Sequence, residues 1–222
     1  MSLEIKLDVS RAKSSAVGKD HGITPAEFQE IEPRVLEIHD VLQQERRDKA
    51  YGFYDLHKDT DTLNKVKASA ASFREKGYDN IVILGIGGSA LGITALQTAL
   101  NSKYHNLLTK RGRKGSPRLF VMDNIDPVTF HAMLRVCPPH KTLYNVISKS
   151  GGTAETMSQL MLVVQALLKK MDASALKDHL VVTTSPRGEN APKSLLHPVA
   201  DEYGLTTFDI PLNVGGRFSV FT

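Results

Sequence analysis

The stretch that decides the fold reads Asn80-Ile81-Val82-Ile83-Leu84-Gly85-Ile86-Gly87-Gly88-Ser89-Ala90-Leu91-Gly92. Its continuous apolar run, 81–84, is typical of a strand buried on both faces of a parallel sheet. Glycines crowd the turn that follows, where they let the backbone adopt positive φ and approach a ligand closely. The amides at the start of the next helix attract anions. The stretch therefore predicts a strand, an anion-binding turn and a helix.

The same alternation of short apolar runs with helical segments continues to the end of the chain. Strands are expected over 81–84, 118–123, 142–147, 179–184 and 206–210, and helices over 90–100, 127–136, 153–170 and 191–203. Strands that alternate with helices indicate parallel strands in a layered sheet. We predict an α/β fold, a three-layer αβα doubly wound sheet of about five parallel strands in the flavodoxin-like order.

The first part of the chain has helical periodicity instead. Thr24-Pro25-Ala26-Glu27 is a helix start, with Thr as N-cap and Pro in the first turn. Pro33 falls inside the following apolar pattern, where a kink or restart is expected. A second helix is expected over 60–76. We therefore predict an N-terminal helical extension over residues 1–79 and a sheet domain over residues 80–222.

The amino-acid composition excludes several classes of protein. The chain has 222 residues, of which 41% are hydrophobic and 23% charged, as in ordinary globular domains. A single cysteine, Cys137, excludes a disulfide framework and suits a reducing cytoplasm. His131 and His140 flank it with poor ligand spacing, so we expect no metal. The N-terminus lacks a secretory pattern, and the longest apolar stretches are too short to span a membrane.

The net charge of +4 is compatible with an anionic ligand. The basic run Lys110-Arg111-Gly112-Arg113-Lys114 could contact nucleic acid. However, it lies among glycines between a helix and a strand, and no aromatic residues interleave with it to stack bases. We therefore interpret it as a solvated loop and expect no nucleic-acid partner.

A second motif, Ser148-Lys149-Ser150-Gly151-Gly152-Thr153-Ala154-Glu155-Thr156, follows the third expected strand. Its hydroxyls and backbone amides can donate to several phosphate oxygens, and a lysine adds charge. The motif lacks the order of a Walker A loop. Helix capping by Gly152 or Thr153 is the structural alternative, and it is compatible with ligand binding.

In the expected strand order, the first and third strands are neighbours, so both motifs would meet at one crevice at the carboxyl edge. A phosphorylated small molecule would use both. Gly85, Gly87 and Ala90 also fit a dinucleotide fingerprint, but Asp123 lies much further on than the ~20 residues at which its ribose-binding acid is expected. A third segment, Asn213-Val214-Gly215-Gly216-Arg217-Phe218-Ser219-Val220, brings an arginine behind two glycines, suited to an oxyanion.

Taken together and in this order, the three segments resemble the glucose-6-phosphate isomerase family over roughly residues 53–222. The resemblance implies a sugar-isomerase (SIS) domain. It also implies interconversion of glucose 6-phosphate and fructose 6-phosphate, in glycolysis and gluconeogenesis, without a metal or an organic cofactor.

The resemblance also assigns roles by motif. The phosphate would be held by the side chains of Ser148, Ser150 and Thr153, with Lys149 contributing mainly through its backbone. Two further residues, Gly88 and Ser89, would contact the sugar or the phosphate. The developing charge of the enediolate intermediate would be stabilised by Arg217.

The family's general base, a glutamate, and its ring-opening histidine and lysine lie downstream of the third segment, beyond Thr222. We therefore expect the amino-terminal part of the enzyme, which binds sugar phosphate without isomerising it. The resemblance implies a homodimer for the full-length enzyme. The alternatives are a stand-alone sugar-phosphate-binding regulatory module and a Rossmann-type dinucleotide-binding domain.

Overall fold

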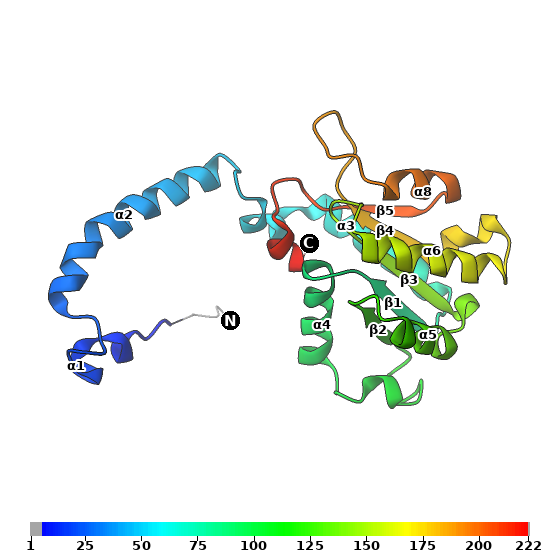
Figure 1. Cartoon of the computed structure of the whole chain (residues 1–222), viewed down its shortest axis with the longest axis horizontal. Coiled ribbons are helices and arrows are strands. Elements are labelled where there is room, and N and C mark those ends of the chain that lie inside the picture. The colour runs from blue at the N-terminus through cyan, green and yellow to red at the C-terminus, as the bar shows by residue number, and fades with distance from the viewer. Residues whose placement is uncertain (1–5, 222) are drawn as a thin grey trace. The chain divides into compact units, whose positions relative to one another are not determined.

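The chain forms two compact units in the computed structural model, which describes residues 6–221 and, for residues 219–221, only the backbone (Figure 1). The first unit ends at Ala50 and the second begins at Tyr51. Parts of the sequence predictions, namely the N-terminal residues 1–5, Thr222 and the side chains of Ser219 and Val220, lie outside the described residues.

The first unit is helical, as expected. It contains η1 (Ser10–Ala12), α1 (Ser14–Val17) and the long helix α2 (Pro25–Arg47). Thr24 starts α2 through a capping box, because its hydroxyl accepts the Glu27 amide at 3.3 Å while the Glu27 carboxylate accepts the Thr24 amide at 2.8 Å. Pro33 lies inside α2, which continues to Arg47 as one helix.

The second unit is built on a five-stranded parallel sheet. Its strands are β1 (Asn80–Leu84), β2 (Arg118–Met122), β3 (Thr142–Ile147), β4 (Leu180–Thr184) and β5 (Thr206–Asp209). They lie in the order β2-β1-β3-β4-β5, with every neighbouring pair parallel. The predicted α/β class and flavodoxin-like order are therefore confirmed, and β1 and β3 are neighbours.

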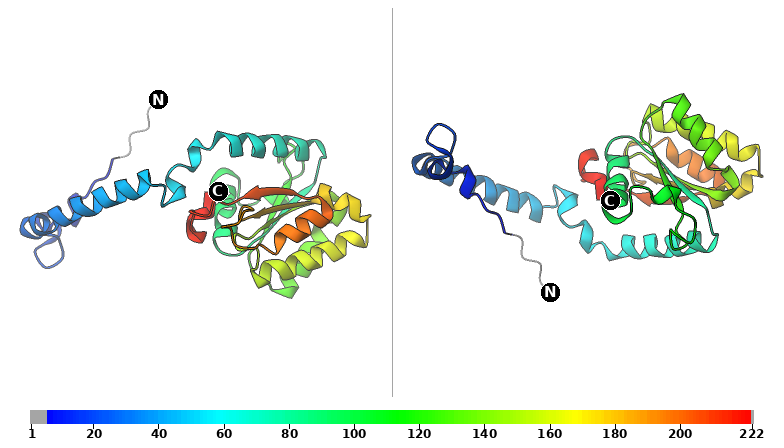
Figure 2. Two further views of the ribbon diagram at one scale, coloured as in Figure 1. Left: turned by 90° about the horizontal axis from the view of Figure 1, so that it is seen from above. Right: turned by 90° about the horizontal axis from the view of Figure 1, so that it is seen from below.

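Helices cover both faces of this sheet. The long ones are α3 (Thr60–Glu75), α4 (Gly88–Leu100), α5 (Pro127–Val136), α6 (Ala154–Leu168) and α8 (Leu196–Tyr203). Figure 2 shows α3 on one side of the sheet and α5, α6 and α8 on the other. The short elements are η2 (Gly52–Tyr54), η3 (Leu56–Lys58), η4 (His105–Leu107), η5 (Pro139–Lys141), η6 (Ala173–Ala175), α7 (Leu176–His179) and η7 (Gly216–Phe221).

The main core lies between the sheet and α5, α6 and α8. Alternate residues of the central strands, including Val82, Tyr144 and Val182, are fully buried there against Val163 and Leu167 of α6. Alternation follows from the two-residue period of a strand, which sends successive side chains to opposite faces. The opposite face is covered more loosely, since no residue of α3 is buried and a space of about 890 Å³ separates α3 from the sheet.

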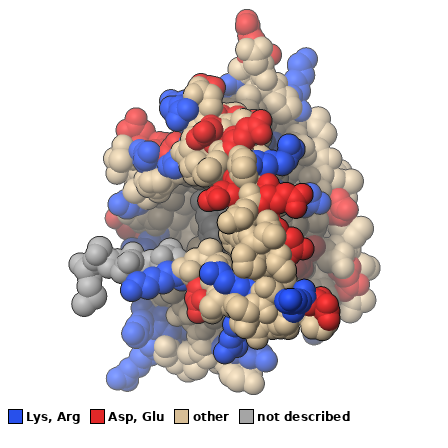
Figure 3. Space-filling view, turned by 90° about the vertical axis from the view of Figure 1, so that its left-hand side faces the viewer, with Lys and Arg blue, Asp and Glu red and all other residues tan. Residues whose placement is uncertain are grey.

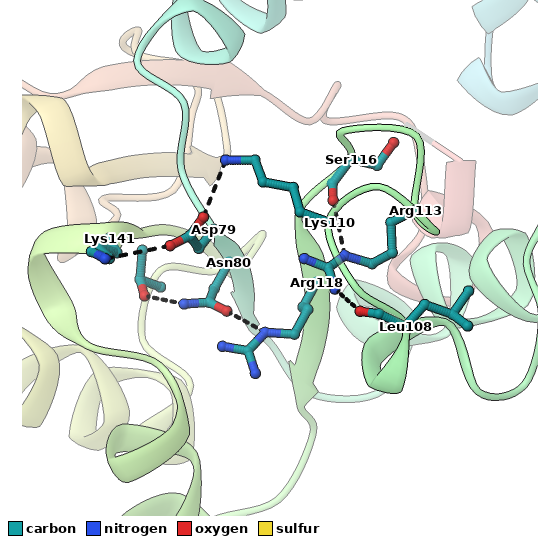
Figure 4. A network of polar contacts seen from close by, with 9 residues as sticks. Asp79, Asn80, Leu108, Lys110, Arg113, Ser116, Arg118 and Lys141 are labelled. Atoms are coloured by element: carbon teal, nitrogen blue, oxygen red, sulfur yellow. Dashed lines mark hydrogen bonds and ion pairs between the residues drawn. The ribbon is translucent and has the colours of Figure 1, made fainter.

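A polar network joins the segments at the amino edge of the sheet (Figure 4). Asp79 pairs with Lys110 at 3.3 Å and with Lys141 at 3.8 Å, and the adjacent Asn80 accepts a hydrogen bond from Arg118 at 2.8 Å. These contacts tie the loops before β1, β2 and β3 together.

The basic run at 110–114 is partly structural rather than a wholly solvated loop. Arg113 is buried and donates hydrogen bonds to the carbonyls of Ser116, at 3.0 Å, and Leu108. Two of its cations, Lys110 and Arg113, thus have partners within the fold. The face of the molecule drawn in Figure 3 carries acidic and basic side chains interspersed.

Most predicted element boundaries agree with the structure to within two residues, and one helix start differs by more. The helix expected over 191–203 begins at Leu196, because the preceding loop is held by hydrogen bonds of Ser194 to Thr184 and of Ser185 to the Pro192 carbonyl. The compact unit that holds the sheet begins at Tyr51, and a domain division at residue 80 stays a prediction. Residues 51–79 therefore lie in the same unit as the sheet.

Candidate anion-binding site

A hollow of about 420 Å³ opens at the carboxyl edge of the sheet. Its walls come from the loops that follow β1, β3, β4 and β5, at the topological switch point where β1 and β3 are adjacent. The lining residues are Ile86, Gly88, Ser89, Ile147, Ser148, Lys149, Ser150, Thr153, Pro192 and Gly216.

The loop after β1 forms one wall. Gly87 has φ 59° and ψ −121°, a conformation that favours glycine, and it immediately precedes α4. No side chain caps α4, so its first amides are not bonded to an N-cap side chain. Gly88 and Ser89, the first two residues of α4, line the hollow.

The loop after β3 forms the opposite wall and is internally hydrogen-bonded. The hydroxyl of Ser148 is buried, lies 3.0 Å from the Thr153 hydroxyl and accepts the Gly151 amide at 3.1 Å. The Ser150 hydroxyl accepts the Gly152 amide at 3.3 Å. Ser148, Ser150 and Thr153 all line the hollow, so the loop brings three hydroxyl-bearing residues to one wall, and hydroxyls suit several phosphate oxygens.

Helix capping does not occupy the start of α6. Thr153 is its N-cap residue, but its side chain makes no capping hydrogen bond and contacts Ser148 instead. The first amides of a helix and its dipole favour a negative charge. Of the two N-cap residues that the sequence left open, the structure has Thr153 and not Gly152, but the Thr153 side chain does not cap the helix. The start of α6 therefore resembles an anion-binding helix end.

Gly151 fixes how the loop after β3 meets the loop after β4. Its φ is 66°, and an added Cβ would lie 1.8 Å from the Ser194 hydroxyl oxygen and 2.8 Å from the Ser194 Cα. Ser194 is itself held by a hydrogen bond of 2.8 Å to Thr184. Glycine is needed here for both the backbone conformation and the close approach.

The loop after β5 is tied to the loop after β3 by Lys149. Its ammonium group donates to the carbonyls of Leu212, at 3.0 Å, and Val214. The Asn213 carbonyl also accepts the Gly52 amide at 2.9 Å. These bonds place the segment that carries Gly216 beside the hollow.

Most of the predicted site residues lie together in the structure. All six predicted substrate-binding residues line the hollow: Gly88, Ser89, Ser148, Lys149, Ser150 and Thr153. Arg217 is exposed and is not a lining residue, although its neighbour Gly216 is. The acid considered for dinucleotide binding, Asp123, is also exposed and outside the lining. Substrate binding and catalysis by these residues stay predictions.

Sequence reasoning missed Ile86, Ile147 and Pro192 as lining residues. Pro192 follows β4, and the parallel topology already places that loop at the same edge of the sheet. The strand order was thus the signal that could have found it. Ile147 is the last residue of β3, and Ile86 lies in the loop two residues after the end of β1.

Cys137 lies in the core and not in the hollow. It is fully buried, and burial raises the pKa of its thiol to about 11. The thiol is therefore protonated and inert near neutral pH. Over residues 6–221, no group of three or more His, Cys, Asp or Glu side chains is arranged to hold a metal ion.

The doubly wound sheet, with two helix starts that lack a side-chain cap and with hydroxyl-bearing residues at its switch point, defines an α/β protein with a candidate anion-binding site. The comparison with known families is more specific: the family model described as "Phosphoglucose isomerase" matches residues 56–222. The chain belongs to the phosphoglucose isomerase family.

Individual relatives agree with this assignment. The chain is 44% identical over 184 residues to a glucose-6-phosphate isomerase of Carboxydothermus hydrogenoformans, covering 82% of this chain and 38% of the relative. It is 37% identical over 201 residues to that of Rubrobacter xylanophilus, covering 90% and 44%. The chain thus spans less than half the length of these relatives.

Two solved structures are also similar to this chain. A hypothetical protein of Thermus thermophilus superposes with a TM-score of 0.71 at 34% identity, covering 88% of this chain and 43% of that one. A glucose-6-phosphate isomerase of Chlamydia trachomatis superposes with a TM-score of 0.53 at 28% identity, covering 73% and 28%.

Proposed function

We propose that this chain supplies the phosphate-binding half of a glucose-6-phosphate isomerase active site, within the SIS domain expected over residues 80–222. The observation that carries the proposal is the hollow at the switch point. Two motifs more than fifty residues apart in the sequence line it together: Gly88 and Ser89 on one side, and Ser148, Ser150 and Thr153 on the other.

In this proposal the phosphate of glucose 6-phosphate or fructose 6-phosphate lies against the Ser148–Thr153 loop. There it accepts hydrogen bonds from hydroxyls and from the first amides of α6. The sugar extends toward Gly88, Ser89 and Gly216. Arg217 follows Gly216 directly, and its guanidinium stabilises the enediolate oxygens as negative charge develops in the aldose–ketose conversion.

The 222-residue chain by itself is proposed to bind sugar phosphate without turning it over. Isomerisation requires a general base that removes a proton next to the carbonyl. No carboxylate or imidazole is present among the described residues that line the hollow.

The catalytic activity of the whole enzyme, its homodimer and its cytoplasmic location are likewise proposals that follow from the family. Within residues 6–221, each helix is either too short or too polar to span a lipid bilayer.

Thermal unfolding with ligand tests the proposal. Fructose 6-phosphate and a sugar-phosphate acid, 6-phosphogluconate, should raise the Tm, because a ligand that binds only the folded state stabilises it. NAD should not. Ser150→Ala should reduce the shift, while Ser72→Ala on the exposed side of α3 should leave it unchanged. A shift with NAD and none with either sugar phosphate would instead support the Rossmann-type alternative.

A coupled assay tests the second half of the proposal. The isolated chain is expected to form no glucose 6-phosphate from fructose 6-phosphate above the uncatalysed rate. Normal turnover would show that the base lies within these 222 residues. Sugar-phosphate binding together with regulation of a partner protein would favour the stand-alone regulatory module.

A further inference from the structure

Lys149 lies in the middle of the proposed phosphate-binding loop, yet its ammonium group is directed to backbone carbonyls. Two of its three N–H donors are used by the carbonyls of Leu212, at 3.0 Å, and Val214. Hydrogen bonds from an ionised donor are about twice as strong as neutral ones. Lys149 therefore joins the loops that follow β3 and β5, which are far apart in the sequence.

The Lys149 backbone is fixed from the other side. Its carbonyl accepts the Ser185 amide at 3.1 Å and lies 3.4 Å from the Thr184 hydroxyl, both at the end of β4. The side chain consequently extends from an anchored position on the sheet edge. An anchored lysine can orient the loop that it contacts, rather than be oriented by it.

The loop that Lys149 contacts carries Gly216 and Arg217. Val214, one of the two accepting residues, is fully buried, and its amide donates to the Pro211 carbonyl at 3.1 Å. The carbonyl and the amide of a trans peptide point in opposite directions. Holding the carbonyls of residues 212 and 214 thus also fixes the directions of the amides of residues 213 and 215.

We propose that Lys149 is a positioning residue: its ammonium group holds the 211–217 loop against the phosphate-binding loop and so sets the place of Gly216 and Arg217. The inference rests on the proposed function for its role in substrate binding. Its structural part stands independently. It adds a role for the side chain to the role expected from the sequence, in which Lys149 contributes mainly through its backbone.

Hydrogen exchange tests the structural part without any ligand. In Lys149→Met, the amides of Val214 and Phe218, which donate to Pro211 and Gly215 carbonyls, should exchange at least about tenfold faster. Amides of β3 should keep their wild-type protection, which verifies that the sheet is folded. The control Lys193→Met removes an exposed lysine from the loop before α8 and should leave all these rates unchanged. Unchanged rates at residues 214 and 218 in Lys149→Met would overturn the proposal.

Ligand titration separates positioning from direct phosphate binding. Inorganic phosphate needs only the phosphate loop, whereas 6-phosphogluconate also presents a carboxylate to Arg217. Lys149→Met should weaken 6-phosphogluconate at least about fivefold more than it weakens phosphate. Arg217→Ala should show the same selective loss. In the double variant the two losses should not add, because both act through one interaction.

The outcomes are distinct. An equally large loss of affinity for both ligands in Lys149→Met would make Lys149 a direct phosphate ligand and overturn the positioning role. Additive losses in the double variant would also overturn it. Wild-type protein that binds neither ligand would instead refute the proposed function, and the exchange rates would then decide the inference about the loop.

Discussion

Gly151→Ala tests the close contact between the loops that follow β3 and β4. Two costs are expected. Alanine at φ 66° occupies the left-handed region, which costs roughly 1–2 kcal/mol for a residue with a Cβ. The new Cβ would also lie 1.8 Å from the Ser194 hydroxyl oxygen and 2.8 Å from its backbone Cα, so rotating the side chain cannot relieve the overlap. Overpacking of this kind costs about 1–3 kcal/mol.

The free energy of unfolding should therefore fall by about 2–5 kcal/mol in total. Urea unfolding followed by far-ultraviolet circular dichroism measures it. The same variant should also lose affinity for inorganic phosphate, because relieving the overlap moves the loop whose amide at residue 151 is hydrogen-bonded to Ser148.

Two other glycines separate the two costs. Gly77 at the end of α3 also has positive φ, 69°, but has no atom within 4 Å of an added Cβ, so Gly77→Ala should cost only about 1–2 kcal/mol. Gly152 lies in the same loop as Gly151 with open space and no positive φ, so Gly152→Ala should leave stability unchanged or raise it by up to about 1 kcal/mol. A stability cost for Gly151→Ala that is no larger than the cost for Gly77→Ala would show that the two loops do not approach this closely.

Four further predictions concern three side chains. Ser148→Ala removes the acceptor of the Gly151 amide, so the Kd for inorganic phosphate should rise about tenfold in equilibrium dialysis, about 1.4 kcal/mol of binding energy; an unchanged Kd would contradict the site. Cys137 should react with a thiol reagent at pH 8 only upon unfolding, because burial raises the pKa of its thiol to about 11, and rapid labelling of the folded protein would contradict this. Since the folded state holds that proton more tightly, the contribution of Cys137 to stability should be lost as the pH rises from about 8.5 toward 11. Arg113→Met should lower the free energy of unfolding by about 1–3 kcal/mol, because two carbonyl acceptors lose their charged donor. The control Arg111→Met, at an exposed position, should change the free energy of unfolding by less than about 0.5 kcal/mol. Equal effects of the two substitutions would refute the structural role of Arg113.

Local patterns predicted most of the fold. The strand over 142–147 and the helix over 127–136 were placed at their observed bounds, because apolar runs and N-terminal prolines are signals within a few residues. The helix over 191–203 was predicted five residues too early. Hydrogen bonds of Ser194 to Thr184 and of Ser185 to the Pro192 carbonyl hold the residues before Leu196 in a loop.

The candidate site was predicted through topology as much as through motifs. Once β1 and β3 are neighbours, the two loops that follow them must meet, so the six residues from those loops line one hollow. Pro192 and the partners of Lys149 could not be found from motifs. Their positions depend on contacts between loops whose conformations are set by tertiary hydrogen bonds and not by their own sequence.

The sequence alone determined the order of strands and helices, the position of the glycine and hydroxyl motifs at strand ends, and the family. These depend on hydrophobic periodicity and on short motifs, which act within one or two turns of chain. Only the tertiary structure decided that the Thr153 side chain contacts Ser148 instead of capping α6, and that Arg113 is buried. It alone decided that the Lys149 ammonium binds the carbonyls of residues 212 and 214. A polar side chain can satisfy its hydrogen bonds with many partners, and the partner it takes is the one that the fold brings within reach.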